Sequence, residues 1–468
     1  MNFKKYLGTL ILFFTAFAMQ AQNQQASFKV PAYEKTVLKN GLTIYLMEQH
    51  EVPMINVSAI MPAGAIYDGA QSGLANMTAE ALMHGTKNKS KSQIEEELDF
   101  IGASVSTYAS KEAAGLSAKF ASKDKDKVLA IIRDVLLTPT FNATEFEKAK
   151  KLLLAELEQA KESPRNVIGN YFDQVTYGDH VYANPEAGRA TTVAKLSVSD
   201  AQKFYKTNYI PNGSAIAIVG DFNAKEMKAK LTTLFSSWAK GTTPVNAANK
   251  KVVPANTARV LLVNKDDARE TTFYIGGPGV PRNNPDYVAM EVVNTLFGGR
   301  FTSWLNDELR VNTGLTYGAR SNFSRLKNAG SFNISTFTAT KNTEAAIDKS
   351  IEVLNRLHTK GIDDKTLTSA KNYVKGQFPP RYETAGQLAG LLTQMFWYDF
   401  NESFINNFQK SVDELTAEKA KEIVAKYFPK NNLQFVLVGK AEDIRKIAEK
   451  YGKVTEVQIK DDGIMKTF

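Results

Sequence analysis

The sequence contains no cysteine, few histidines and only one long apolar run. Without cysteine the chain forms no disulfide and has no acceptor for a bacterial lipid anchor, so its folded parts depend on packed cores. The four histidines, His50, His84, His180 and His358, are widely separated. This spacing leaves no pair that is close enough in sequence to form a two-histidine metal motif.

The one long apolar run lies at the N-terminus. Lys4 and Lys5 precede apolar residues 6–19, which small and polar residues follow. This pattern is typical of a secretory signal peptide. We therefore expect a signal peptide at residues 1–21, cleaved after Ala18 or Ala21, and a mature chain in a bacterial periplasm. An uncleaved anchor helix is the alternative, although the run is short for a membrane span of about 20 residues. No later stretch approaches that length.

The formal net charge is +9, of which the expected signal peptide contributes two lysines. The remaining basic residues alternate with acids, as in residues 123–127 and 148–151. No basic stripe with interleaved aromatic residues is present, so a nucleic-acid partner is not expected.

The second half of the chain repeats the first at a long period. Residues 196–220 and 415–439 each read as a capped helix, an aromatic turn with proline, and a strand that ends in Val-Gly, at an offset of 219 residues. Residues 146–157 and 367–378 match as amphipathic helices at an offset of 221. Two matches at nearly the same offset predict a duplicated domain of roughly 220 residues.

Each half reads as strands interspersed with helices. Alternating patterns predict strands at residues 41–47, 54–61, 104–109 and 115–121, then near 260–262, 272–275, 317–323 and 330–338. Helices are expected at 125–137, 144–161 and 286–297. This order predicts an α+β fold with two homologous domains, each a mostly antiparallel sheet packed with helices. We place the domains at 27–240 and 257–468, with a polar linker at 241–256.

The layout resembles the pitrilysin, insulin-degrading and mitochondrial processing peptidase family of inverted-motif zinc peptidases, in its short bacterial form. The resemblance covers essentially the whole mature chain. It rests on the order of Gly73-Leu74-Ala75, Gly85-Thr86, Gly102, Tyr108, Gly220, Gly298-Gly299, Leu309-Arg310 and Gly314-Leu315-Thr316-Tyr317.

The resemblance implies that the zinc motif of this chain is degenerate. The family carries H-x-x-E-H in the frame of residues 73–86, where two histidines bind zinc and the glutamate is the general base. Here those three positions are Asn76, Ala79 and Glu80. The family's third ligand corresponds to Glu156, which is either a retained ligand or an ordinary helix carboxylate. We therefore expect no metal or other cofactor in this chain.

An altered metal site is an alternative. Glu80 and His84 are expected on one helix face at i and i+4, and Glu156 could approach them. One histidine and two carboxylates can bind zinc in principle. Peptide hydrolysis also needs a base beside the metal-bound water, and Ala79 supplies none.

The second half retains a different pair of family residues. The family's C-terminal domain carries an arginine and a tyrosine, seven residues apart, which face the zinc and polarise the scissile carbonyl. Arg310 and Tyr317 have that spacing here. A guanidinium fork and a phenol are suitable donors for a developing oxyanion. The alternative is an arginine in a surface ion pair and a tyrosine packed in the sheet.

Three functions are compatible with these residues. The favoured one is a non-catalytic, substrate-binding subunit of a heterodimeric periplasmic zinc metallopeptidase, in which Arg310 and Tyr317 act on peptides beside a homologous partner that has the intact motif and the zinc. The strand at 104–109 is the edge to which the family's substrates add as a further strand. The second is a peptide-binding or scaffold pseudoenzyme outside any proteolytic complex. The third is an active homodimer that uses Glu80, His84 and Glu156.

Overall fold

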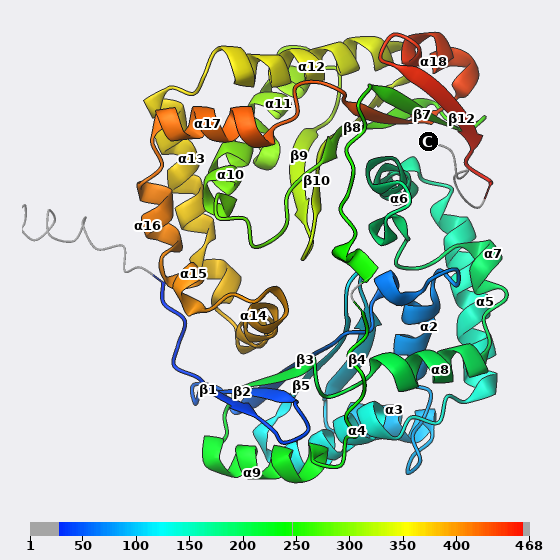
Figure 1. The fold of residues 1–468 in the computed structure, drawn as a ribbon, viewed down its shortest axis with the longest axis vertical. Helices are drawn as coiled ribbons and strands as arrows, with labels where there is room; N and C mark the ends of the chain where they lie inside the picture. Colours follow the sequence, from blue (N-terminus) through cyan, green and yellow to red (C-terminus); the bar gives the residue numbers. More distant parts are fainter. Residues whose placement is uncertain (1–27, 246, 462–468) are drawn as a thin grey trace, which may run out of the picture.

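Two six-stranded sheets, one from each half of the chain, form the centre of the fold (Figure 1). In the strand Met54–Met61, half-buried and buried residues alternate over its whole length, because successive side chains point to opposite faces of a sheet. The computed structural model describes residues 28–245 and 247–461. The expected signal peptide lies outside the described residues.

The first sheet has the strand order β1-β2-β6-β3-β5-β4. Only the β2–β6 pair is parallel, and the other pairs are antiparallel. Its strands are β1 (Glu34–Val37), β2 (Thr43–Glu48), β3 (Met54–Met61), β4 (Ser104–Ala109), β5 (Ala114–Ala121) and β6 (Ala215–Gly220).

The second sheet has the order β12-β7-β11-β8-β10-β9. The β12–β7 and β7–β11 pairs are parallel and the rest are antiparallel. Its strands are β7 (Arg259–Asn264), β8 (Glu270–Pro278), β9 (Ala319–Arg325), β10 (Gly330–Ala339), β11 (Gln434–Gly439) and β12 (Lys453–Gln458).

The two sheets confirm the duplication and the α+β fold class. Strands β2, β6, β3, β5 and β4 correspond in order and direction to β7, β11, β8, β10 and β9. The sixth strand differs: β1 precedes its sheet in sequence and is antiparallel, whereas β12 follows its sheet and is parallel. Each repeat therefore supplies five equivalent strands, and the strand at one edge of each sheet, β1 or β12, is not part of the repeat.

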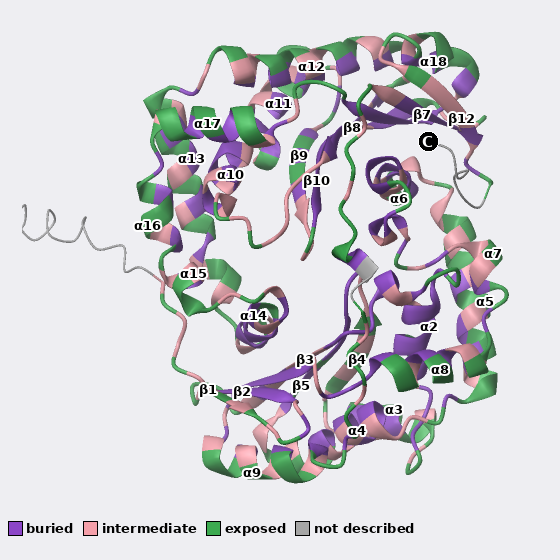
Figure 2. Ribbon diagram, in the orientation of Figure 1, coloured by how far each residue is buried: buried purple, intermediate pink, exposed green. Residues whose placement is uncertain are grey.

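Amphipathic helices cover the outer faces of both sheets, and the exposed residues gather on these helices while the strands are largely buried (Figure 2). The longer helices of the first half are α2 (Leu74–Ala81), α3 (Lys91–Phe100), α4 (Lys125–Leu137), α5 (Ala143–Ala160), α6 (Pro164–Tyr177), α8 (Val198–Asn208) and α9 (Ala224–Phe235). Those of the second half are α10 (Tyr287–Asn294), α12 (Thr343–Thr359), α13 (Asp364–Gln377), α14 (Ala385–Tyr398), α17 (Ala417–Tyr427) and α18 (Ala441–Ala448). Two π-helical segments, η5 (Thr295–Gly299) and η6 (Asp307–Asn312), interrupt the second half.

One helix from each half crosses to the sheet of the other half. Helix α6 packs on β8 and β11, where Ile168 and Phe172 share a buried cluster with Val436 and Val438. Helix α14 packs on β3 and β6, and Figure 1 shows it beside the first sheet. Since each crossing buries an apolar helix face against a sheet of the other half, the exchange ties the two halves together.

A buried polar cluster also joins the halves. The Glu112 carboxylate, 4% exposed, accepts hydrogen bonds from the backbone N–H of Lys327 at 2.9 and 3.0 Å and from the hydroxyl of Tyr182. Burial raises the pKa of Glu112, and these hydrogen bonds oppose the rise. The segment between the halves is held nearby, because His180 Nε2 lies 2.8 Å from the carbonyl oxygen of Lys250.

Two predicted elements differ from those observed. The helix expected at 286–297 runs from Tyr287 to Asn294 as an α-helix and then widens into η5. The strand expected from residue 317 begins at Ala319, so Tyr317 lies in the preceding loop. Within the described ranges, no helix combines the length and apolarity that crossing a bilayer requires.

Candidate functional site

The N-terminus of α2, the helix that carries the degenerate motif, is fixed by Gly73 and Asp68. Gly73, the N-cap of α2, has a φ of 96°, which glycine adopts without strain. The Asp68 carboxylate accepts hydrogen bonds from the backbone N–H groups of Gly73 and Ala75, each at 2.8 Å. Burial raises the pKa of Asp68 to about 7, against the effect of these two hydrogen bonds. The first turn of α2 is thereby fixed to the loop before it.

The three degenerate positions lie on α2 in different environments. Asn76 is half-buried, Ala79 is 1% exposed and Glu80 is exposed. The carbonyl oxygen of Ala79 accepts a hydrogen bond of 2.7 Å from the hydroxyl of Thr107 on β4. The position that carries the family's general base is therefore a buried methyl group, which cannot take a proton.

Glu156, on α5, is the residue that approaches Glu80. Partial burial raises the pKa of Glu80, and the charge of Glu156 raises it further, while Lys91 lowers it. Two carboxylates that repel each other favour protonation of one of them, and the Lys91 ammonium opposes this effect at Glu80. The Glu156 carboxylate is therefore close enough to Glu80 to act on its charge.

His84 does not join them, and the expectation of a shared helix face with Glu80 is wrong. Helix α2 ends at Ala81, and His84 lies in the following turn. Its side chain, 3% exposed, faces a polar cavity beside Lys91 and Glu145. Burial, followed by the charge of Lys91, lowers the pKa of His84 to about 4 against an opposing effect of Glu145.

These residues do not fit zinc. The three positions that would hold the metal offer the amide of Asn76 and the mutually repelling carboxylates of Glu80 and Glu156, and the His84 imidazole lies instead beside Lys91 and Glu145. Among residues 28–245 and 247–461, no group of three histidine, aspartate or glutamate side chains is arranged to hold a metal ion. Tight zinc sites use histidine or cysteine ligands with few exceptions, so the chemistry of this donor set argues against a metal here.

The second pair of candidate residues leaves the backbone at neighbouring points. The carbonyl oxygen of Leu309 accepts hydrogen bonds from the N–H groups of Leu315 at 2.8 Å and Thr316 at 3.2 Å. Leu309 and Thr316 directly precede Arg310 and Tyr317. These hydrogen bonds close a turn, so that the Cα atoms of Arg310 and Tyr317 lie near each other although the two residues are seven positions apart in sequence.

Tyr317 is exposed on a firmly held loop. Its side chain is 81% exposed, and its ring stacks on Phe337 at 6.3 Å between centroids. Two threonine hydroxyls fix the loop: Thr316 donates to the Phe337 carbonyl oxygen at 2.6 Å, and Thr338 donates to that of Leu315 at 2.6 Å. The backbone is ordered while the phenol faces solvent.

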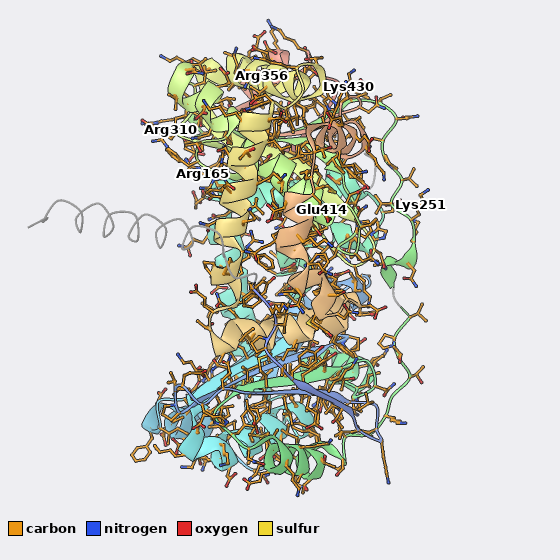
Figure 3. All side chains as sticks on the ribbon, turned by 90° about the vertical axis from the view of Figure 1, so that its left-hand side faces the viewer. Arg165, Lys251, Arg310, Arg356, Glu414 and Lys430 are labelled. Atoms are coloured by element: carbon orange, nitrogen blue, oxygen red, sulfur yellow. The ribbon has the colours of Figure 1, made fainter. Side chains whose placement is uncertain are left out.

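Arg310 is exposed as well, and its guanidinium lies 4.7 Å from the ring centroid of Phe301. Arg165, from the crossing helix α6, lies with its guanidinium 3.4 Å from the centroid of Phe337 and lines a groove of about 330 Å³ with Tyr317. Both arginines lie along one side of the molecule (Figure 3).

Sequence reasoning missed Arg165, Phe337 and Asp68. The first two reach the groove only because α6 crosses to the second sheet, and no local pattern predicts that crossing. Asp68 lies five residues before the N-cap Gly73, outside the position where a helix-start pattern places its capping residue, so no sequence pattern pointed to it either.

Comparisons with known proteins agree with this geometry. Residues 44–188 match the family model described as "Insulinase (Peptidase family M16)", and residues 195–374 match that described as "Peptidase M16 inactive domain". Among solved structures, a peptidase M16 inactive domain from Pseudomonas fluorescens superposes with a TM-score of 0.82 at 24% identity, covering 87% of this chain and 98% of that one. A protease from Helicobacter pylori superposes with a TM-score of 0.81 at 20% identity, covering 88% and 100%.

Curated relatives carry both active and inactive descriptions. An uncharacterised zinc protease YmxG of Bacillus subtilis is 23% identical over 72% of this chain and 81% of its own length. A non-peptidase homologue YmxG of Helicobacter pylori is 24% identical over 84% and 90%. Subunit 1 of the rat mitochondrial cytochrome b-c1 complex is 26% identical over 58% and 57%. This chain belongs to the M16, or insulinase, peptidase family, as a member in which the inverted zinc motif is degenerate.

Proposed function

We propose that this chain is the non-catalytic, substrate-binding subunit of a heterodimeric periplasmic zinc peptidase. Its partner is a homologous secreted chain with an intact H-x-x-E-H motif, and the zinc belongs to that partner. This chain completes the peptide chamber and supplies Arg310 and Tyr317 to the scissile carbonyl. Two properties of the molecule support the proposal. The first half lacks the residues for zinc chemistry, and the second half exposes two donors for an oxyanion.

The observation that carries the proposal is the exposure of Tyr317 on an anchored loop. A tyrosine with a packing role is buried on its ring, whereas this one is 81% exposed. Because the hydroxyls of Thr316 and Thr338 already fix the backbone, little further ordering is needed when the phenol meets a ligand. A subunit that stabilises a transition state formed at its partner's zinc needs such a donor, held in place and open to the chamber.

A peptide site on the first half is compatible with this role. Strand β4 is the outermost strand of its sheet, and its residues alternate between exposed and half-buried. An unpaired sheet edge accepts an extended peptide through main-chain hydrogen bonds with little sequence selectivity. The same strand contacts α2 through Thr107, so an added peptide would run beside the degenerate helix.

The scaffold alternative is favoured by one finding, the similarity to subunit 1 of the rat cytochrome b-c1 complex. A scaffold needs no exposed phenol at Tyr317. The two functions therefore differ in whether the chemistry of this residue affects any activity.

Mixing experiments test the proposal. The mature chain, a secreted homologue with the intact motif, and an equimolar mixture of the two are assayed with a fluorogenic peptide. We expect the chain alone to be inactive and the mixture to hydrolyse peptide faster than the homologue alone. A homologue that is fully active by itself, with no gain from this chain, would contradict the proposal.

A further inference from the structure

A second cavity lies in the C-terminal half, between β9, η5 and α13. Its volume is about 410 Å³. The residues that define its chemistry are Glu291, Arg320, Arg325, Tyr373, Gln377 and Arg381. Of these residues only Arg320 also lines the groove that contains Tyr317.

This cavity is the counterpart of the degenerate zinc site. The repeat that relates residues 146–157 to 367–378 places Gln377 at the position of Glu156. In the first half, α2 packs on the edge strand β4. In the second half, η5 packs on the edge strand β9, where a Cβ on Gly298 would lie 2.3 Å from Ser321 Oγ, so only glycine permits the approach.

The charge of the cavity is opposite to that of the zinc-site counterpart. Three of its four charged side chains are arginines, which leaves two positive charges beyond the single Glu291. Glu291 is bound by Arg381 at 2.9 Å and lies 3.6 Å from Arg325. The first half instead presents Glu80 and Glu156 at this place.

Two of these arginines are available to an anion: Arg320 is exposed, and Arg325 is buried with an unused donor. Arg320 forms no ion pair and no side-chain hydrogen bond with any residue that the structure describes. The Arg325 side chain is 8% exposed, and its Nε has no acceptor among the described residues. A buried donor without an acceptor costs free energy, which an anion drawn into the cavity would recover.

We propose that this cavity binds a carboxylate, and that a peptide supplies it through its C-terminus or an acidic side chain. Arginine forks match a carboxylate with two parallel hydrogen bonds. Arg320 and Ser335 line both this cavity and the groove that contains Tyr317, so the two are continuous. The choice of a peptide as carrier rests on the proposed function, whereas the carboxylate site itself does not.

Calorimetric titration of the isolated mature chain at low ionic strength tests the site. Three N-acetylated probes are compared: a short oligoglutamate amide, an oligoglutamine with a free C-terminus, and an oligoglutamine amide. The first presents only side-chain carboxylates, the second only a terminal carboxylate, and the third none. We expect the first or the second to bind and the third not to bind, and the one that binds identifies the source of the carboxylate.

Three variants locate the binding. Arg320→Gln and Arg381→Gln should each weaken it about tenfold, since each removes a charge-assisted partner. Arg445→Gln is the matched control, because Arg445 is exposed on α18 and bound to Glu456 outside the cavity. Equal weakening in all three variants would show attraction to the net positive charge and overturn the proposal, as would no binding of either carboxylate probe. Both results leave the mixed-subunit assay unaffected, so the two proposals fail separately.

Discussion

Replacing His84 by leucine tests the assignment of this residue to a buried, neutral state. In the unfolded chain the imidazole titrates near its usual pKa of 6.5, whereas in the folded chain burial and Lys91 hold that pKa at about 4. Between these values the unfolded state binds more protons, so folding stability is present above pH 6.5 and falls as the pH drops toward 4. The difference of about 2.5 pKa units, at about 1.36 kcal/mol for each, gives a loss of about 3 kcal/mol.

The assay is denaturant unfolding of the mature chain and of His84→Leu at several pH values between 8 and 4. Other carboxylates titrate in this range, and the difference between the two proteins removes their effect. We expect little change near pH 8, because Nδ1 of His84 has no hydrogen-bond partner among the described residues and leucine is of similar size. At pH 4 the variant should have gained about 3 kcal/mol relative to the natural chain. Parallel pH profiles for the two proteins would refute the reasoning.

Two further predictions concern helix α2. Restoring the motif by Asn76→His, Ala79→Glu and Glu80→His should create zinc binding, measured by metal analysis after dialysis. Adding Glu156→Gln to this triple variant should abolish the gain. If the zinc content is the same with and without Glu156→Gln, Glu156 is a surface charge. Asp68→Ala should lower the free energy of unfolding by about 2–4 kcal/mol, because two backbone N–H groups at a helix start lose a carboxylate acceptor, and a loss below about 0.5 kcal/mol in denaturant titration would remove Asp68 from its capping role.

Local patterns predicted most strands and several helices because their periodicity depends only on which face is buried. The strands Met54–Met61 and Ser104–Ala109 and the helix Lys125–Leu137 have the expected bounds. The duplication was also readable, since two segments repeat at nearly the same offset and occupy equivalent places in the two sheets.

Long-range contacts were not readable in the same way. The crossing of α6 and α14 depends on which sheet face remains uncovered after each half folds, and no residue pattern records that choice. His84 was misplaced because an i, i+4 spacing has meaning only inside a helix, and α2 ends at Ala81. The arginine cavity gathers residues from β9, α10, α13 and the 3-10 turn Pro379–Tyr382 that follows α13, which are up to 90 positions apart, as in the Glu291–Arg381 pair.

The rate of peptide hydrolysis by the mixed subunits, with variants in this chain, tests the central claim most directly. Tyr317→Phe and Arg310→Ala should each slow turnover by about 10²–10³-fold, the usual effect of removing one oxyanion donor. Tyr451→Phe and Arg445→Ala are matched controls that lie on other parts of the second half. Size-exclusion chromatography must show the same complex for every variant. If Tyr317→Phe and Arg310→Ala assemble and turn over at the unmodified rate while the mixture remains active, this chain contributes no chemistry to the complex and is a scaffold.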